Sequence, residues 1–446
     1  MSEMVLDTSP RSEAYGKKLS RMIQKETVSC RGQQDRTKFL EFHDLLEELF
    51  PNVHQTCKKH VFDGSLLFKW QGKGNKEPIL LMSHQDVVEA KGEWLHSPFA
   101  GDIDEEGRVW GRGSVDTKSS LFCIFTAVEE LIEEGYVPEC DVYIASSCTE
   151  EWSGDGAPNT AKYLEENQIR LRLLLDEGGL VVERPIPMVQ GTYAMVGIVE
   201  KGYGDVRFTA RGKGGHASAP GKNTPLVRLG KFMEEVDRKS PFKAQYTPVV
   251  EEMFRRIAPS MNPVLGWVFS HPGMFRPLLK KLLPSVSPAA AAMLRTTIAF
   301  TMAKGSDGAN VLPQEASVVA NMRFIHHQPN KESMECIRRI AEKYEIETEV
   351  IYQDEPCPIV DFKGEMFRMV EEVIQNVYQG VGVCPYVMTG GTDAKYYKNI
   401  CDNCIRFAPL YIDAQQYASI HALNENIYQG TLPMGVDFYK EIIRRS

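Results

Sequence analysis

The sequence lacks several features that would assign it to whole classes of protein. Its 446 residues contain no run of about 18 or more uninterrupted apolar residues, so we expect no transmembrane helix. Lys and Arg (51) are outnumbered by Asp and Glu (60), and the formal net charge of −9 argues against nucleic acid as the main partner. Internal repeats and low-complexity segments are also missing, which leaves a globular protein.

The N-terminus lacks the apolar core of a signal peptide and the composition of a transit peptide, because MSEMVLDTSPRSEAYG is polar and contains acids. The ten cysteines are scattered, which predicts a cytoplasmic protein with mostly free thiols. Cys401 and Cys404 have C-x-x-C spacing, but no second pair and no nearby His accompanies them. We therefore expect buried strand cysteines rather than a redox or metal site.

The length of the chain predicts two domains. In the first ~195 residues, strand-length apolar runs (79–82, 142–146 and 171–175) alternate with helical patterns. Residues 119–134 place apolar side chains at helical spacing, and Gly135 follows where a helix C-cap would lie. This order predicts an α/β domain with a largely parallel sheet.

The pattern changes near residue 197. Residues 205–210 and 316–324 are typical of strands with one more exposed face, and residues 226–239 and 331–344 of amphipathic helices. These elements predict a smaller α+β domain.

The α/β pattern returns near residue 355, so the middle of the chain is expected to be an insertion. We predict one domain from residues 1–197 and 355–446, with residues 198–354 inserted. The inserted part carries a Pro-punctuated helical insert at about 242–296.

Acidic and imidazole side chains stand where apolar elements end. In LLMSHQDVVEA, a core strand breaks off into His84 and Asp86. The other stretches are GRGSVDTKSS with Asp116, SCTEEWSGDG with Glu150 and Glu151, LLLDEGG with Asp176 and Glu177, and SIHALNENI with His421. Because the carboxyl ends of parallel strands converge on one edge of a sheet, we expect these groups to meet.

Several carboxylates held together raise one another's pKa, and divalent cations relieve that cost. Two His and three or four carboxylates suit zinc, with cobalt or manganese as alternatives, and their number fits two metals bridged by one carboxylate. His84 would ligate a metal, Asp86 would orient its ring, and Asp116 would bridge. Of Glu150 and Glu151, one can ligate while the other moves a proton.

Each motif alone has a plainer interpretation. A His-x-Asp at a strand end and a pair of adjacent acids are usually structural or solvated. Asp116 alone would serve as a helix N-cap, and Asp176 with Glu177 as a turn. Five such motifs in one chain, each beside a sheet-like run, favour the metal site.

In chain order, SHQDVVE, GRGSVDTKSS, TEEWSGDGA, LLLDEGG, GKGGHASAP and IHALNE resemble the motifs of one zinc metallopeptidase family. It contains aminoacylase, glutamate carboxypeptidase, acetylornithine deacetylase and succinyl-diaminopimelate desuccinylase. The resemblance covers nearly the whole chain. LLLDEGG, the helical insert and LRTTIAFTMAKGSDGANVLPQEASVVANMR are similar to the branch of carboxypeptidase S and the N-fatty-acyl-amino-acid hydrolases.

This resemblance implies an α/β, mostly parallel-sheet catalytic domain with two zincs and an inserted α+β lid and dimerisation domain. The implied metal ligands are His84, Asp116 (bridging), Glu151, His421 and either Asp176 or Glu177. Glu150 is the implied general base and Asp86 the partner of His84. The peptide bond after Asp116 is expected to be cis.

The resemblance also implies substrate contacts. His216 matches a loop histidine that reaches a substrate oxyanion, commonly across a dimer; alone, it is a histidine in a Gly-rich turn. The other matched positions are Asn310 and Arg323 in the lid and Gly391 and Thr392 in a loop near the substrate carboxylate. Lys395 stands where relatives often have Arg, so it keeps the charge and loses bidentate geometry.

We therefore expect a dinuclear zinc hydrolase that acts on an amide bond next to a free carboxylate, and a homodimer formed through the lid. Its substrate is a dipeptide, a peptide C-terminus or an N-acyl amino acid. One alternative is a synthase/hydrolase of N-fatty-acyl amino acids. Another is a non-catalytic metal-binding homologue, which is disfavoured because every expected catalytic position is occupied.

The helical insert allows two interpretations. Its apolar side chains line an acyl pocket or dock on lipid, or else they serve ordinary helix packing and dimer contact. The residues concerned are Trp267, Val268, Phe269, Met274 and Phe275.

Overall fold

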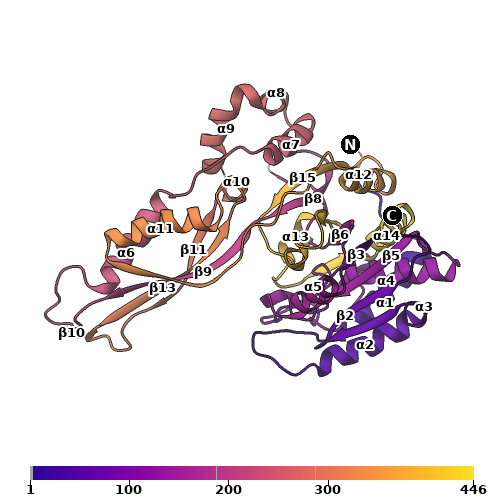
Figure 1. The fold of residues 1–446 in the computed structure, drawn as a ribbon, viewed down its shortest axis with the longest axis horizontal. Coiled ribbons are helices and arrows are strands. Elements are labelled where there is room, and N and C mark those ends of the chain that lie inside the picture. Colours follow the sequence, from indigo (N-terminus) through magenta and orange to yellow (C-terminus); the bar gives the residue numbers. More distant parts are fainter. Residues whose placement is uncertain (1–3, 187, 287) are drawn as a thin grey trace.

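The computed structural model describes residues 4–186, 188–286 and 288–446, and two β-sheets organise it (Figure 1). The larger sheet has ten strands. Their spatial order is β1 (Lys58–Phe62), β2 (Ser65–Trp70), β5 (Cys140–Ser146), β3 (Lys76–Met82), β6 (Leu173–Asp176), β16 (Cys404–Arg406), β8 (Thr192–Glu200), β7 (Val181–Glu183) and β17 (Tyr411–Ile412), with β15 (Gly382–Met388) also paired to β8.

The centre of this sheet is parallel, because β5, β3, β6 and β16 pair in the same direction. Both faces of β3 are buried: Ile79 and Leu81 enter one apolar cluster, and Leu80 and Met82 enter another on the opposite face. A strand covered on both sides needs apolar residues at every position, which explains the continuous run in the sequence. The mostly parallel α/β architecture is as predicted.

Helices cover both faces of the large sheet. One face is covered by α1 (Pro10–Ile23), α2 (Thr37–Leu49), α3 (Pro51–Thr56), α4 (Lys118–Glu133), α12 (Glu365–Val377) and α14 (Leu432–Arg445). The other is covered by α5 (Gly156–Glu166) and the 3₁₀ helix η3 (Asp393–Tyr397). Helix α4 ends as predicted, because Gly135 has φ +74° and donates its N–H to the Ile132 carbonyl.

The smaller sheet is antiparallel and extends away from the larger one (Figure 1). Its order is β11 (Thr297–Lys304), β13 (Glu315–Phe324), β9 (Gly202–Arg211) and β14 (Ile346–Gln353). Helices α6 (Pro225–Arg238) and α11 (Asn330–Lys343) pack on one face, and alternate residues of β13 are buried there. This alternation is the physical reason for the more polar strands in this part of the sequence.

A single residue, Lys201, separates β8 of the large sheet from β9 of the small one. Its amino group, which is buried, donates hydrogen bonds to the carbonyls of Ala292 and Arg295 and to Thr297 Oγ1. Burial lowers the pKa of Lys201 to about 7. The Lys201 side chain therefore ties the junction between the sheets to the segment that joins α10 and β11.

Four helices fill the chain between α6 and β11: α7 (Pro248–Ile257), α8 (Pro263–Ser270), α9 (Pro272–Val286) and α10 (Pro288–Leu294). They pack with the core of the large sheet, and α7 lies against β15. Phe269 stacks on Phe254 with ring centroids 4.4 Å apart. The division at residues 198 and 354 stays a prediction.

The remaining elements are short. They are β4 (Arg108–Trp110) paired with β18 (Asn426–Tyr428), β10 (Gly215–His216) paired with β12 (Val311–Leu312), α13 (Ala414–Ser419), and the 3₁₀ helices η1 (Glu150–Trp152), η2 (Ala258–Ser260) and η4 (Gln429–Thr431). Within the described ranges, no helix combines the length and apolar character needed to cross a bilayer. Cys401 and Cys404 are buried free thiols, as expected.

Candidate metal centre

The acidic and imidazole residues converge at the carboxyl ends of β3, β5 and β6. His84 follows β3, Glu150 and Glu151 form the first turn of η1 after β5, and Asp176 ends β6 with Glu177 next in the chain. Asp116 precedes α4, and His421 follows α13. These seven residues come from segments that span more than 300 positions of the sequence, and the topology of the sheet brings them to one edge.

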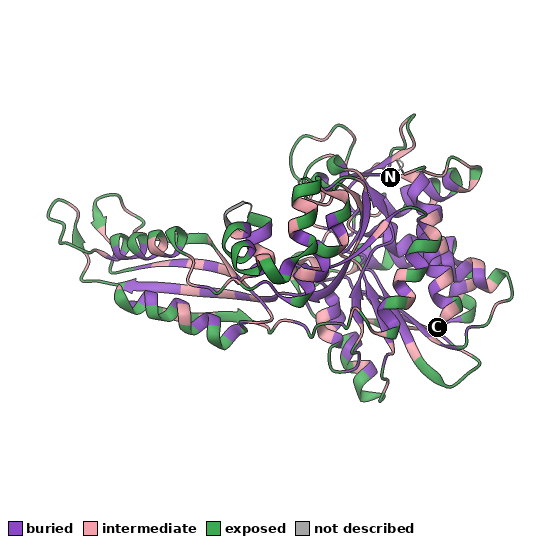
Figure 2. Cartoon of the chain, turned by 90° about the horizontal axis from the view of Figure 1, so that it is seen from above, coloured by how far each residue is buried: buried purple, intermediate pink, exposed green. Residues whose placement is uncertain are grey.

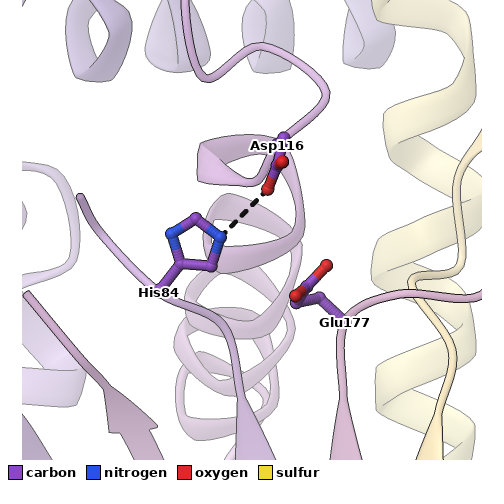
Figure 3. Close-up of side chains that lie close together, drawn as sticks. All are labelled: His84, Asp116 and Glu177. Atoms are coloured by element: carbon purple, nitrogen blue, oxygen red, sulfur yellow. Dashed lines mark hydrogen bonds and ion pairs between the residues drawn. The ribbon is translucent and has the colours of Figure 1, made fainter. Parts of the chain in front are cut away.

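Two groups of ligand-type atoms share Asp116. One group is His84, Asp116 and Glu177, whose side chains point toward one another in Figure 3. The other is Asp116, Glu151 and His421; within each group the atoms lie within 4.8 Å of one another. The two oxygens of Asp116 are divided between them, because Oδ1 is 3.0 Å from His84 Nε2 and Oδ2 is 2.9 Å from His421 Nε2. The Asp116–Thr117 peptide bond is cis, as expected.

The electrostatics of this cluster fit divalent cations. Burial, and then the nearby Asp116, raise the pKa of both Glu151 and Glu177. Hydrogen bonds to Asp116 and Glu151 raise the pKa of His421 to about 10. Glu151 Oε1 is buried and has no hydrogen-bond partner among the described residues. A buried carboxylate oxygen without a partner, in a cluster that stabilises positive charge, matches the chemistry of a metal ligand.

Adjacent Asp176 and Glu177 differ in their surroundings. Both oxygens of Asp176 accept backbone N–H groups, one from Glu177 (2.9 Å) and one from Ala394 (2.8 Å). Glu177 instead points into the cluster with His84 and Asp116. The geometry thus favours Glu177 over Asp176 as the fifth ligand, and Asp176 fastens the loop that carries it.

Asp86 lies beneath His84 and Glu150. The ring Nδ1 of His84 is 2.9 Å from the Asp86 main-chain carbonyl and 3.4 Å from its carboxylate. That carboxylate also accepts the Ser29 hydroxyl and the N–H groups of Glu150 and Glu151. One buried aspartate therefore orients the imidazole and the turn that carries both glutamates.

Sequence reasoning missed the groups that hold Asp116. The buried carboxylate of Glu425 accepts the N–H groups of Val115 (2.8 Å) and Asp116 (3.0 Å). Its other oxygen pairs with Arg112 Nη1 at 2.6 Å. The sequence does contain a signal for these two residues, because Arg112 lies within the GRGSVD motif and Glu425 is four residues after His421.

Two cavities meet at the cluster, and Glu150, Glu151, His421, Gly390 and Gly391 line both. The first, about 250 Å³, is lined beyond the cluster by apolar and aromatic side chains, with glycines and threonines between them. Its apolar and aromatic lining consists of Val115, Leu180, Tyr386, Met388, Ala408, Tyr417 and Ile420. Thr392, which also lines it, donates its N–H and hydroxyl to buried Glu200.

The second cavity, about 720 Å³, is lined by four basic side chains and, outside the cluster, by the acidic residues Asp155, Glu200 and Asp354. Its basic side chains are Arg31, Lys201, Arg323 and Lys395. Arg323 lies over the Tyr203 ring at 4.7 Å, and Lys395 pairs with Asp354 at 3.3 Å. Arg31 was another residue that sequence reasoning missed, because an isolated loop arginine has no distinguishing pattern.

The structure does not bring His216 or Asn310 to the cluster. His216 lies on β10, at the far end of the small sheet in Figure 1, and neither cavity includes it. Asn310 lies beside it, because its carbonyl accepts the Ala217 N–H at 2.9 Å. Both side chains are exposed.

Comparison with known proteins agrees with this geometry. Residues 80–445 match the family described as Peptidase family M20/M25/M40. The chain belongs to this family. As an M20 member it is a hydrolase of amide bonds in a metal-dependent family.

Curated relatives of this M20 protein span nearly its whole length. Probable carboxypeptidase S-like 2 of Dictyostelium discoideum is 30% identical over 424 residues, 93% of this chain and 80% of that protein. The N-fatty-acyl-amino acid synthase/hydrolase PM20D1 of Homo sapiens is 29% identical (95% and 86%). Carboxypeptidase S of Saccharomyces cerevisiae is 30% identical (87% and 75%).

Solved structures share the fold. The M20 family metallo-carboxypeptidase Sso-CP2 of Sulfolobus solfataricus superposes with a TM-score of 0.68 at 16% identity, covering 96% of this chain and 98% of its own. Human carnosine dipeptidase 1 gives a TM-score of 0.67 at 12% identity, with 97% and 96% covered. The expected family, branch and fold are thereby confirmed.

Proposed function

We propose that this M20 hydrolase holds two divalent cations, zinc before cobalt or manganese, and cleaves an amide bond beside a free carboxylate. The proposal rests on the position of Asp116, whose two carboxylate oxygens lie in different ligand groups. A carboxylate placed in this way suits a bridge between two metals. His84 and Glu177 complete one site, and Glu151 and His421 the other.

Metals held there would polarise the scissile carbonyl and acidify the attacking water. The protein supplies the proton transfer. Glu150 belongs to neither ligand group, lines both cavities, and has a pKa raised above its ordinary value by burial. We assign it as the general base that takes the water proton and returns it to the leaving amine.

We assign oxyanion stabilisation to His216 of a second copy of the chain. In the first copy, the ring Nδ1 accepts the Ser218 N–H at 3.1 Å, which leaves Nε2 available to donate a hydrogen bond. Nε2 has no partner within the described residues, and the side chain is exposed. A homodimer through the small sheet would bring it, with neighbouring Asn310, to the cleft of the other copy.

The two cavities favour opposite ends of a substrate. In the second cavity, the guanidinium groups of Arg31 and Arg323 suit the free carboxylate, and Gly391 lies at the border with the apolar pocket. The apolar pocket, at about 250 Å³, is smaller than the roughly 300–1,000 Å³ of sites for drug-sized ligands. A dipeptide, a peptide C-terminus or an N-acyl amino acid with a compact apolar group therefore fits better than a long fatty acyl chain.

The proposal also assigns a role to the middle of the chain and a cellular compartment to the protein. Residues 198–354 would act as the lid and dimerisation domain, since Arg323 reaches the cleft from the small sheet. The cytoplasm would be the site of action, which the ten free thiols support.

The deciding experiment measures metal content and turnover together. Purified protein is assayed by elemental analysis and with a panel of dipeptides and N-acyl amino acids, before and after chelation. The proposal expects two metals per chain and chelator-sensitive cleavage that zinc restores. One metal per chain, or full turnover without metal, would contradict the two-metal mechanism.

A further inference from the structure

The segment between α7 and the end of β11 has a charge opposite to that of the chain as a whole. From Met253 to Ser306 the sequence contains no Asp or Glu and seven Lys and Arg, whereas the whole protein carries a formal charge of −9. Such an asymmetry is uncommon on a solvated surface, where both signs usually alternate. Helices α8 and α9 lie in this segment and project from the upper edge of the molecule in Figure 1.

Large apolar side chains are exposed on the same two helices. Val264 and Trp267 of α8 have relative exposures of 73% and 52%, and Met274 and Leu278 of α9 have 68% and 49%. Each pair is spaced at one helical turn and so shares a face. Figure 2 shows that helices of the molecule carry exposed strips beside buried ones.

The inward-facing side chains of α8 and α9 pack within the protein itself. Phe269 stacks on Phe254, and Leu279 and Leu283 are buried in the core. Trp267 contacts the Phe275 ring edge-on at 5.3 Å, which places the outward side of α8 next to the start of α9. Packing against the rest of the chain therefore does not account for the outward apolar residues.

Two cations flank this apolar face without acidic partners. Lys280 and Lys281 are exposed, and neither forms an ion pair within the part of the chain that the structure describes. Arg276 differs, because it pairs with Glu251 at 2.5 Å. Exposed Trp, Met and Leu beside unpaired lysines form the pattern of a helix that lies in the interface of an anionic bilayer.

We propose that α8 and α9 dock the protein on an anionic lipid surface, with Val264, Trp267, Met274 and Leu278 inserted among the acyl chains and Lys280 and Lys281 at the headgroups. The charge of the segment selects lipid over a second copy of the chain, since a copy would present the same positive face. This binding is peripheral, and it is independent of the metal centre and of the proposed reaction.

Vesicle sedimentation with the full-length protein tests the proposal. We expect binding to phosphatidylcholine vesicles that contain phosphatidylserine, and at least tenfold weaker binding to phosphatidylcholine alone, since each basic residue near an anionic surface contributes about fivefold. Lys280→Glu with Lys281→Glu should reduce binding by about tenfold or more. The matched control is Lys17→Glu with Lys18→Glu on α1, another Lys-Lys-Leu sequence in a helix, which should leave binding unchanged.

A second pair of variants tests the apolar contribution. Trp267→Ser should weaken binding and abolish the blue shift of tryptophan fluorescence on vesicles, whereas Leu40→Ser, on α2 and equally exposed (52%), should do neither. Hydrolysis of a small soluble substrate should be unchanged in all four variants, which separates this proposal from the proposed function. Vesicle binding that is absent, or lost equally in the controls, overturns it. The proposal is also overturned if the substitutions in α8 and α9 change only the oligomeric state and not vesicle binding, because the apolar face is then a contact between copies of the chain.

Discussion

The carboxyl edge of the large sheet and the tip of the small sheet both present candidate catalytic side chains, but they hold them differently. At the edge, His84, Asp116 and Glu177 are fixed by buried neighbours. Asp86 and Glu425 each accept two backbone N–H groups of the loops that carry the ligands. At the tip, the His216 side chain is exposed, and among the described residues it hydrogen-bonds to Ser218 of its own loop alone.

This difference separates two kinds of catalytic component. The cluster is complete within one chain, because every ligand-type atom already lies within 4.8 Å of its group. The tip carries a donor without an acceptor, and the role proposed for it depends on a second copy of the chain. A substitution in the cluster should therefore inactivate only the chain that carries it. A substitution at the tip should be complemented by a partner chain.

The largest effect is expected at the residue that both ligand groups share. Asp116→Asn should remove metal and lower kcat/KM by more than about a thousandfold, beyond the roughly 10–100-fold of an outer-sphere partner. Elemental analysis and steady-state kinetics measure both. Asp102→Asn, in the exposed pair with His96, is the control and should retain metal and activity. A variant that kept two metals would show that Asp116 is not the bridge.

The next effect separates two neighbouring glutamates. Glu150→Gln should lower kcat by about 10²–10⁴-fold with metal content unchanged, because it removes only the proton acceptor. Glu151→Gln should lose metal as well, since its carboxylate belongs to a ligand group. The same two assays apply. Full activity of Glu150→Gln with normal metal content would falsify its assignment as the base.

The tip should show a smaller and rescuable defect. His216→Ala should lower kcat by about 10²–10³-fold through loss of one oxyanion donor. Mixing it with inactive Glu150→Gln chains should restore about one quarter of the wild-type rate, since half of the dimers are mixed and each holds one intact site. His271→Ala is the histidine control. Failure of the mixture to recover activity would place His216 outside the partner's site.

The smallest effect is expected from the group behind Asp116. Glu425→Gln weakens the acceptor of two backbone N–H groups and the partner of Arg112, so metal affinity should fall about 10–100-fold. Titration with zinc measures it. Glu106→Gln, in an exposed pair with Arg108, should change nothing. An unchanged affinity in Glu425→Gln would mean that the loop before α4 is rigid without it.

The parts of the site that could be predicted are those carried by strand ends. Apolar runs in β3, β5 and β6 identify buried parallel strands, and the sheet then brings His84, Glu150 and Glu177 together. The choice between Asp176 and Glu177 could not be predicted, because adjacent residues at a strand end point in different directions and only the partners decide.

Other features depend on contacts between distant segments. Glu425 supports Asp116 across 309 positions, and no local pattern encodes that pairing. The helices α7–α10 are rich in apolar residues, but the packing of α7 against β15 and the exposed apolar face of α8 and α9 depend on where the chain returns. The periodicity of apolar residues predicts a helix and its apolar face. It does not predict which surface packs against that face.

The single residue between β8 and β9 has a mechanical consequence. At about 3.3 Å per residue, the ten residues of β9 form an arm of roughly 30 Å from Lys201 toward the tip. A rotation of about ten degrees at that point moves the far end by about 5 Å, enough to bring a donor N–H into or out of hydrogen-bonding range. A small displacement at Lys201, where its amino group is hydrogen-bonded to α10, would therefore become a larger displacement at His216.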